Sequence, residues 1–189
     1  MPISKYMKIE HKVNLKIGDV AATSLVTLYC HAIESESKDP ILSDPKAVEI
    51  TGELNKILSK SENKLYQDLV EGKLKKELVT HIAIRARRYD RYANDFLKKS
   101  HEGGVVNIGC GLDSRFLRID NGKVNFYDLD LPEVIDIKRN FFEETERYHF
   151  ISSSVLDHEW MTKVSEHEGP FLFVAEGVFM YLDQEDVQS

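Results

Sequence analysis

Hydrophobic and polar positions follow different patterns in the two parts of the chain. Between residues 20 and 99, apolar residues recur at intervals of three and four, the spacing of one face of an α-helix. From residue 105 onward, short apolar runs alternate with segments of helical spacing, which is typical of βαβ units and a parallel sheet. The pattern predicts helices over residues 20–35, 43–58, 74–99, 131–146 and 157–165. It predicts strands over residues 105–108, 124–129, 148–152 and 171–176.

The order of these elements predicts an α/β fold. A helical N-terminal cap over residues 1–100 precedes a Rossmann-like half over residues 101–189, in which parallel strands form a doubly wound sheet. The last residues, "LDQEDVQS", carry a helix-start signature with Asp183 as the capping residue. We therefore expect the fold to be truncated after the fourth strand, which leaves that strand partly unpaired.

Composition and charge argue against several classes of protein. The 189 residues, 42% of them hydrophobic, can bury one sizeable core. With a formal charge of −7 and no long basic run, the chain is not expected to bind nucleic acid. No apolar stretch approaches the roughly 20 residues of a membrane-spanning helix, and no secretory signal is found. Cys30 and Cys110 form no CxxC pair, so a reducing, cytoplasmic location is expected.

Two glycines mark the first candidate site. In "VVNIGCGLDSR", an apolar strand is followed by Gly109 and Gly111, whose missing side chains let a ligand lie against the backbone. A dinucleotide-binding fingerprint requires a third glycine where Ser114 stands. A tight turn that holds no ligand is the alternative interpretation of the two glycines.

A carboxylate follows at the end of the next predicted strand. Asp130, in "YDLDLPEV", lies about 20 residues beyond the glycines, where a carboxylate can accept hydrogen bonds from a ribose. The alternative is a capping box, in which Asp130 and Glu133 cap the next helix and Pro132 occupies its first turn. The two roles are compatible.

Two further charged residues stand in apolar surroundings. Arg85 shares one face of a predicted helix with Leu78, Ile82, Tyr89, Tyr92 and Phe96. It therefore needs a partner, either a structural carboxylate or the carboxylate of a ligand. Glu176 follows an apolar strand and should emerge at the carboxyl edge of the sheet, where it can hold an ammonium group or pair with an arginine. Histidine and cysteine spacing predicts no metal site, and no GxSxG motif or phosphate-binding loop occurs.

Four motifs occur in a characteristic order: "VVNIGCGLDSRFLRID", "VNFYDLDLPEVIDIKR", "SSSVLDHEW" and "AEGVFMYL". Together with "IESESKDPILSDPKA" and "RARRYD" upstream, they resemble the leucine carboxyl methyltransferase family, in particular its bacterial branch similar to the tetracenomycin polyketide O-methyltransferase. The resemblance implies a class I methyltransferase that uses S-adenosylmethionine. It also implies that residues 101–189 form the part of the chain that binds this cofactor.

The resemblance implies a role for each of the four candidates. Arg85 would bind the methionine carboxylate, and Gly109 would lie against the methionine part of the cofactor. Asp130 would hold the ribose hydroxyls, and Glu176 would sit near the amino-acid moiety.

The third motif departs from the family pattern. Ser154 and Val155 stand where the family contacts adenine, although the family commonly has aspartate in place of Ser154. Asp157 is the nearby residue that can compensate. Family members also continue beyond this length and supply the last strands and part of the substrate pocket.

Two classes of function stay open. One is an O-methyltransferase that acts on a small-molecule hydroxyl or carboxylate, for which the sequence identifies no general base. The other is a truncated, non-catalytic remnant of the fold that serves as a binding or interaction module. A nicotinamide-dependent oxidoreductase is disfavoured by Ser114. Pairing through the exposed edge of the fourth strand offers a route to homo-oligomers.

Overall fold

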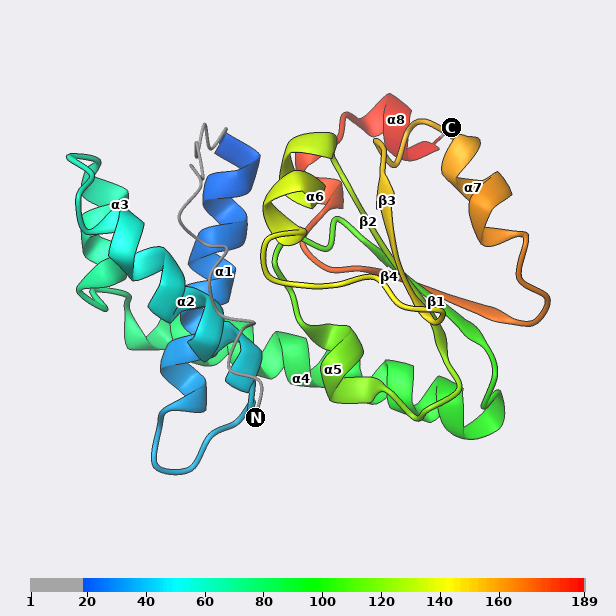
Figure 1. The fold of residues 1–189 in the computed structure, drawn as a ribbon, viewed down its shortest axis with the longest axis horizontal. Helices are drawn as coiled ribbons and strands as arrows, with labels where there is room; N and C mark the ends of the chain where they lie inside the picture. The colour runs from blue at the N-terminus through cyan, green and yellow to red at the C-terminus, as the bar shows by residue number, and fades with distance from the viewer. Residues whose placement is uncertain (1–18, 189) are drawn as a thin grey trace, which may run out of the picture.

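A computed structural model describes residues 19–188 and has an α/β fold (Figure 1). The helices are α1 (Asp19–Ser35), α2 (Pro45–Leu58), α3 (Lys64–Val70), α4 (Lys76–Lys99), α5 (Arg115–Ile119), α6 (Pro132–Lys138), α7 (Glu159–Val164), α8 (Gln184–Gln188) and the 3-10 turn η1 (Phe179–Tyr181). The strands are β1 (Gly104–Ile108), β2 (Asn125–Asp130), β3 (Tyr148–Ser152) and β4 (Phe171–Ala175).

The four strands form one parallel sheet in the order β3-β2-β1-β4. Gly104 is in register with Asn125 of β2 on one side and with Phe171 of β4 on the other. Because the direction of winding reverses at β1, a crevice for ligands is expected beyond the carboxyl end of this strand. All four predicted strands are present, and the predicted Rossmann-like fold class is confirmed.

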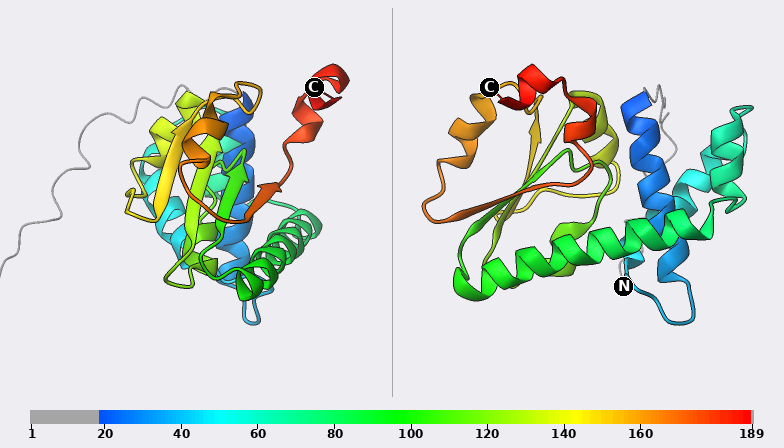
Figure 2. Two further views of the ribbon diagram at one scale, coloured as in Figure 1. Left: turned by 90° about the vertical axis from the view of Figure 1, so that its right-hand side faces the viewer. Right: turned by 180° about the vertical axis from the view of Figure 1, so that it is seen from behind.

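The first helices lie at one end of the molecule, and α4 extends from them along the whole sheet (Figure 2). The largest apolar cluster includes Leu28 of α1, Ile50 of α2, Ala93 of α4 and Phe126 of β2. The helical segment and the sheet therefore share one core, and the domain boundary near residue 100 stays a prediction.

The helix α2 begins at Pro45, two residues after the predicted start at residue 43. The carboxylate of Asp44 accepts a hydrogen bond from the Ala47 amide at 3.0 Å, and Pro45 occupies the first turn. By contrast, α3 was not predicted, because seven residues are too few for helical spacing to be recognised. Its local signal is Asn63, whose side chain accepts a hydrogen bond from the Leu65 amide at 2.9 Å.

The predicted helix over residues 131–146 is too long, because α6 ends at Lys138. Two contacts pull the following residues away from a helical path. Phe142 is buried, and its ring lies edge-on to that of Tyr148 with centroids 6.4 Å apart. Glu144 accepts a hydrogen bond from the Phe150 amide at 2.7 Å and so holds the chain beside β3.

The packed face of α4 also differs from the predicted apolar stripe. Leu78 and Tyr92, both in that stripe, are exposed. The face that packs instead consists of Val79, Ile82, Ala83, Ala86, Asp90, Ala93 and Leu97. Its alanines allow the helix backbone to approach its neighbours closely, so the larger residues of the stripe lie at the rim.

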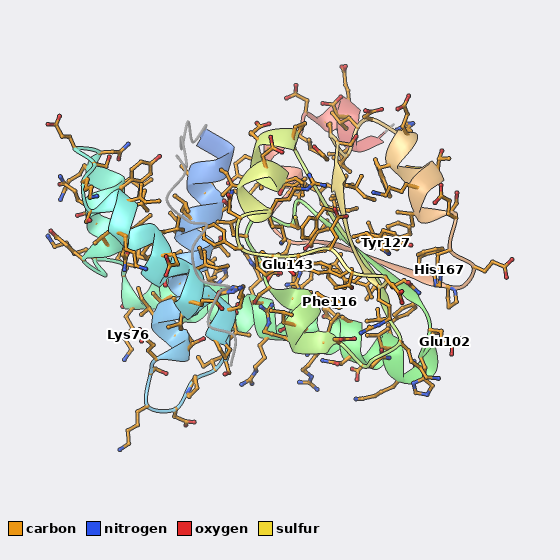
Figure 3. The ribbon with its side chains drawn as sticks, in the orientation of Figure 1. Lys76, Glu102, Phe116, Tyr127, Glu143 and His167 are labelled. Atoms are coloured by element: carbon orange, nitrogen blue, oxygen red, sulfur yellow. The ribbon has the colours of Figure 1, made fainter. Side chains whose placement is uncertain are left out.

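The two faces of the sheet are covered unequally. On one face lies Phe116 of α5, which is labelled in Figure 3. Its ring stacks on that of Tyr148 with centroids 4.3 Å apart. On the other face, Trp160 and Val164 of α7 pack over the strands. Phe173 of β4 keeps 54% of its surface exposed, and within residues 19–188 β4 pairs with β1 alone. This is the partly unpaired fourth strand that the sequence predicts.

Two further features concern the chain as a whole. Cys30 and Cys110 are both buried and free. Among the described residues, no helix is both long and apolar enough to span a membrane.

Candidate cofactor-binding site

A cavity of about 430 Å³ lies at the carboxyl ends of the strands. All six of the predicted cofactor-binding residues line it: Arg85, Gly109, Asp130, Ser154, Val155 and Glu176. The opposite wall comes from α1, which contributes Thr23, Ser24, Val26, Thr27, Leu28 and His31. The fold therefore brings the predicted residues together from α4 and from the ends of all four strands.

Both glycines of the loop after β1 are required by the backbone and by the packing. Gly109 has φ +62° and Gly111 has φ +52°, a region that favours glycine. A Cβ atom on Gly109 would lie 2.4 Å from Cγ2 of Val178, and one on Gly111 would lie 3.0 Å from Cβ of Ser24. The tight turn considered from the sequence is thus present, and the same loop lines the cavity.

Asp130 is fixed at the edge of the cavity by two backbone amides. Its carboxylate oxygens accept hydrogen bonds from Gly111 and from Leu131, each at 2.7 Å. The capping box considered as an alternative role is not formed, because Leu131 occupies the N-cap position of α6 and makes no side-chain capping hydrogen bond. Burial raises the pKa of the Asp130 carboxyl, whereas the two amides oppose this effect.

A buried lysine supports the glycine loop from α6. Lys138 is 0% exposed, and its Nζ lies 2.8 Å from the carboxylate of Asp128. The same Nζ donates hydrogen bonds to the carbonyl groups of Asp113 at 2.7 Å and Gly111 at 3.3 Å. Burial is the largest single effect and disfavours the charged amine, but Asp128 together with Cys110 and Asp113 outweighs it, so the pKa of Lys138 is raised. The loop is therefore held by Asp130 at its amide and by Lys138 at its carbonyls.

Arg85 and Glu176 are partners of each other. Nε of Arg85 donates to Oε1 of Glu176 at 2.7 Å, and the second oxygen of Glu176 pairs with Nη2 of Arg115. For both residues, the structural alternative considered from the sequence is thus realised. The two Nη nitrogens of Arg85 make no hydrogen bond to any residue between 19 and 188, although the side chain lines the cavity.

Arg115 and Arg118 of α5 join the helical segment to the sheet. Arg115 is 1% exposed and donates to Asp90 of α4 at 2.9 Å. Arg118 donates to Asp90 at 2.7 Å and to Asp44 at 2.8 Å. Asp113 lies beside both arginines, which hold the pKa of its carboxyl well below the ordinary value although burial acts in the opposite direction.

The sequence interpretation did not include this ion-pair network. One signal was available: Asp113, Arg115 and Arg118 lie within six residues of each other at the start of a helix. Arg115 and Arg118 are three positions apart, so they share one helix face. Asp90 could be recognised only as a carboxylate on the packed face of α4, a face that the sequence did not identify correctly.

The remaining predicted residues lie in the loop after β3. Ser154 and Val155 line the cavity, and Oγ of Ser154 accepts a hydrogen bond from the Leu156 amide at 3.2 Å. Asp157 is exposed, accepts a hydrogen bond from Ser153 at 3.2 Å and is not part of the cavity wall. A compensating role of Asp157 in adenine binding stays a prediction.

Comparison with known proteins identifies the family. The family model described as leucine carboxyl methyltransferase matches residues 24–189. The chain belongs to the leucine carboxyl methyltransferase family. The match starts at Ser24 in α1, so it includes every cavity-lining residue named above except Thr23.

Two relatives of this family member are informative. The tetracenomycin polyketide synthesis O-methyltransferase TcmP of Streptomyces glaucescens is 29% identical over 173 residues, which cover 91% of this chain and 60% of the relative. The S-adenosyl-L-methionine-dependent methyltransferase dpfgK of Gibberella zeae is 26% identical over 184 residues, which cover 88% of this chain and 57% of the relative. The chain thus spans less than two thirds of the length of these relatives.

Proposed function

We propose that this family member binds S-adenosylmethionine in the cavity and methylates an oxygen atom of a small molecule. One observation carries the proposal: the six residues predicted to contact this cofactor line a single cavity at the carboxyl edge of the sheet. The match of the family model over residues 24–189 does not favour the alternative of a non-catalytic remnant.

Each end of the cavity suits one part of the cofactor. The Nη groups of Arg85 can receive the methionine carboxylate, and the carboxylate of Glu176 can attract the ammonium group. Asp130 is held rigidly where ribose hydroxyls can donate to it, and Ser154 with Val155 can enclose the adenine. These assignments use groups that already line the cavity.

When bound, S-adenosylmethionine would supply an electrophilic methyl group on its sulfonium sulfur. The chain itself contributes position and exclusion of water, which bring an acceptor oxygen into line with that methyl group. The cavity wall beyond the polar residues is largely apolar and includes Val26, Leu78, Ile82, Met180 and Leu182. We therefore propose an acceptor with an apolar or aromatic body that carries a hydroxyl or carboxylate group.

Isothermal titration with S-adenosylhomocysteine tests cofactor binding in the 189-residue protein. We expect binding that weakens on the order of tenfold or more in Arg85→Gln, which removes a charged hydrogen-bond donor. Arg87→Gln is the matched control, because Arg87 lies on the same helix and is exposed. Absence of binding to the folded wild-type protein, or equal loss in both variants, would contradict the proposal. NAD should not compete.

A further inference from the structure

A buried histidine faces the cavity with one nitrogen that has no partner. His31 of α1 is 2% exposed and lines the cavity. Its Nδ1 lies 3.0 Å from the carboxylate of Asp44. Its Nε2 is the one buried side-chain nitrogen or oxygen among the described residues that makes no hydrogen bond. Such an atom is costly to bury unless a ligand or water completes its bonding.

The contact with Asp44 fixes the orientation of the His31 imidazole. Asp44 also accepts hydrogen bonds from Ser114 and from the amide of Ala47, and it pairs with Arg118 at 2.8 Å. Because the Asp44 carboxylate already accepts several hydrogen bonds, it accepts from Nδ1–H of His31 and leaves Nε2 without a partner. Carboxylate-to-histidine pairs of this kind fix both the ring position and the tautomer.

The groups around His31 place it at the same end of the cavity as Arg85. Asp113 approaches it from the loop before α5, with ligand-type atoms of His31, Asp44 and Asp113 all within 4.8 Å of one another. Asp113 in turn pairs with Arg115 at 3.1 Å, and Arg115 shares the carboxylate of Glu176 with Arg85. A metal ion is a poor occupant for this cluster, because Arg118 already pairs with both carboxylates.

We propose that His31 is an additional ligand-binding residue that donates a hydrogen bond from Nε2 to the carboxylate of the cofactor's amino-acid head. The inference rests on the proposed function. Among the described residues, three that line the cavity can carry a positive charge: His31, Arg85 and Arg115. All three donor groups of Arg115 are already bonded, to Asp90, Asn107 and Glu176. An anionic group that enters this end of the cavity therefore meets Arg85 and His31.

Two ligands separate this role from a structural one. S-adenosylhomocysteine carries the amino-acid head, whereas 5′-methylthioadenosine has the same adenosine and thioether sulfur without it. His31→Asn keeps a donor near the Nδ1 position toward Asp44 but removes Nε2. We expect this variant to bind S-adenosylhomocysteine on the order of tenfold more weakly and 5′-methylthioadenosine with unchanged affinity. His31→Gln, which places an amide donor near the Nε2 position, should restore part of the loss.

The contact also sets a requirement on the protons of His31, and an exposed histidine provides the control. To donate from both nitrogens, the imidazole must be protonated, next to Asp44, Asp113, Arg118 and the more distant Arg85. The exposed His81 supplies the control variant His81→Asn, which should behave as wild type.

The outcomes distinguish the inference from the proposed function. If the folded wild-type protein binds neither ligand, both are overturned. If wild type binds S-adenosylhomocysteine but His31→Asn binds it equally well, only the role of His31 is overturned. Equal weakening for both ligands would also overturn it, because the effect would not depend on the amino-acid head. If His31→Asn does not fold, His31→Gln decides the question: it should bind S-adenosylhomocysteine more weakly than wild type and 5′-methylthioadenosine equally well, and any other pattern overturns the role of His31.

Discussion

The substitution Lys138→Met tests whether the buried lysine holds the glycine loop in place. The change keeps the length of the side chain but leaves the Asp128 carboxylate in the core without its cation. Removing one partner of a buried ion pair costs about 3–5 kcal/mol, a large part of the 5–15 kcal/mol that typically stabilises a domain. Urea unfolding followed by circular dichroism should show a midpoint lower by roughly 1 M or more.

A second variant distinguishes the effect of the unpaired Asp128 charge from the effect of lost side-chain packing. In Lys138→Met with Asp128→Asn, the amide oxygen still accepts from Tyr148, which lies 2.5 Å from the carboxylate in the native protein. Most of the lost stability should return, because no unpaired charge stays buried. Lys98→Met is the control, since Lys98 is exposed and should leave the midpoint unchanged. The reasoning is refuted if Lys138→Met unfolds at the wild-type midpoint or if the double variant is no more stable than the single one.

Three further predictions concern other parts of the structure. Gly109→Ala should abolish binding of S-adenosylhomocysteine and lower the unfolding midpoint, because the added Cβ meets Val178. Gly72→Ala is the control: Gly72 has φ +66° but open space around it, so this change should only lower stability by about 1 kcal/mol. Phe173→Ser on the exposed edge strand should reduce concentration-dependent light scattering without a loss of stability; unchanged scattering would rule out that edge as the site of association. Because Arg115 and Arg118 depress the pKa of Asp113, the stabilisation that this carboxylate provides is complete above about pH 4 and is lost below it. Acid unfolding should therefore begin at a higher pH in Arg118→Met than in wild type, and coincident acid transitions would contradict this assignment.

The sequence predicts the elements and the main candidates of the site because these depend on local patterns. Strand boundaries follow from apolar runs, and the start of α2 follows from Asp44 and Pro45. Gly109 and Asp130 were found because they stand at the ends of predicted strands, which a parallel sheet brings to one edge.

Contacts between distant segments could not be predicted in this way. The end of α6 depends on Phe142 and Glu144, which bond to β3 rather than to neighbouring residues. Asp90, which bonds to Arg115 and Arg118, has no local signature that distinguishes it from a solvated helix carboxylate. His31 became recognisable only when the fold placed Asp44 behind it and the cavity in front of it.

The pairing of β1 with β4 sets the order in which the contacts of the protein can form during synthesis. Arg85 and Glu176 are 91 residues apart, whereas Arg115 and Asp90 are 25 apart, so the ion pairs of α4 with α5 can form much earlier during synthesis. At translation rates of 5–20 residues per second, the edge of β1 waits roughly 3–13 s for its partner strand. The ion pair between Arg85 and Glu176, and this part of the cavity wall with it, can therefore form only after β4 has been synthesised.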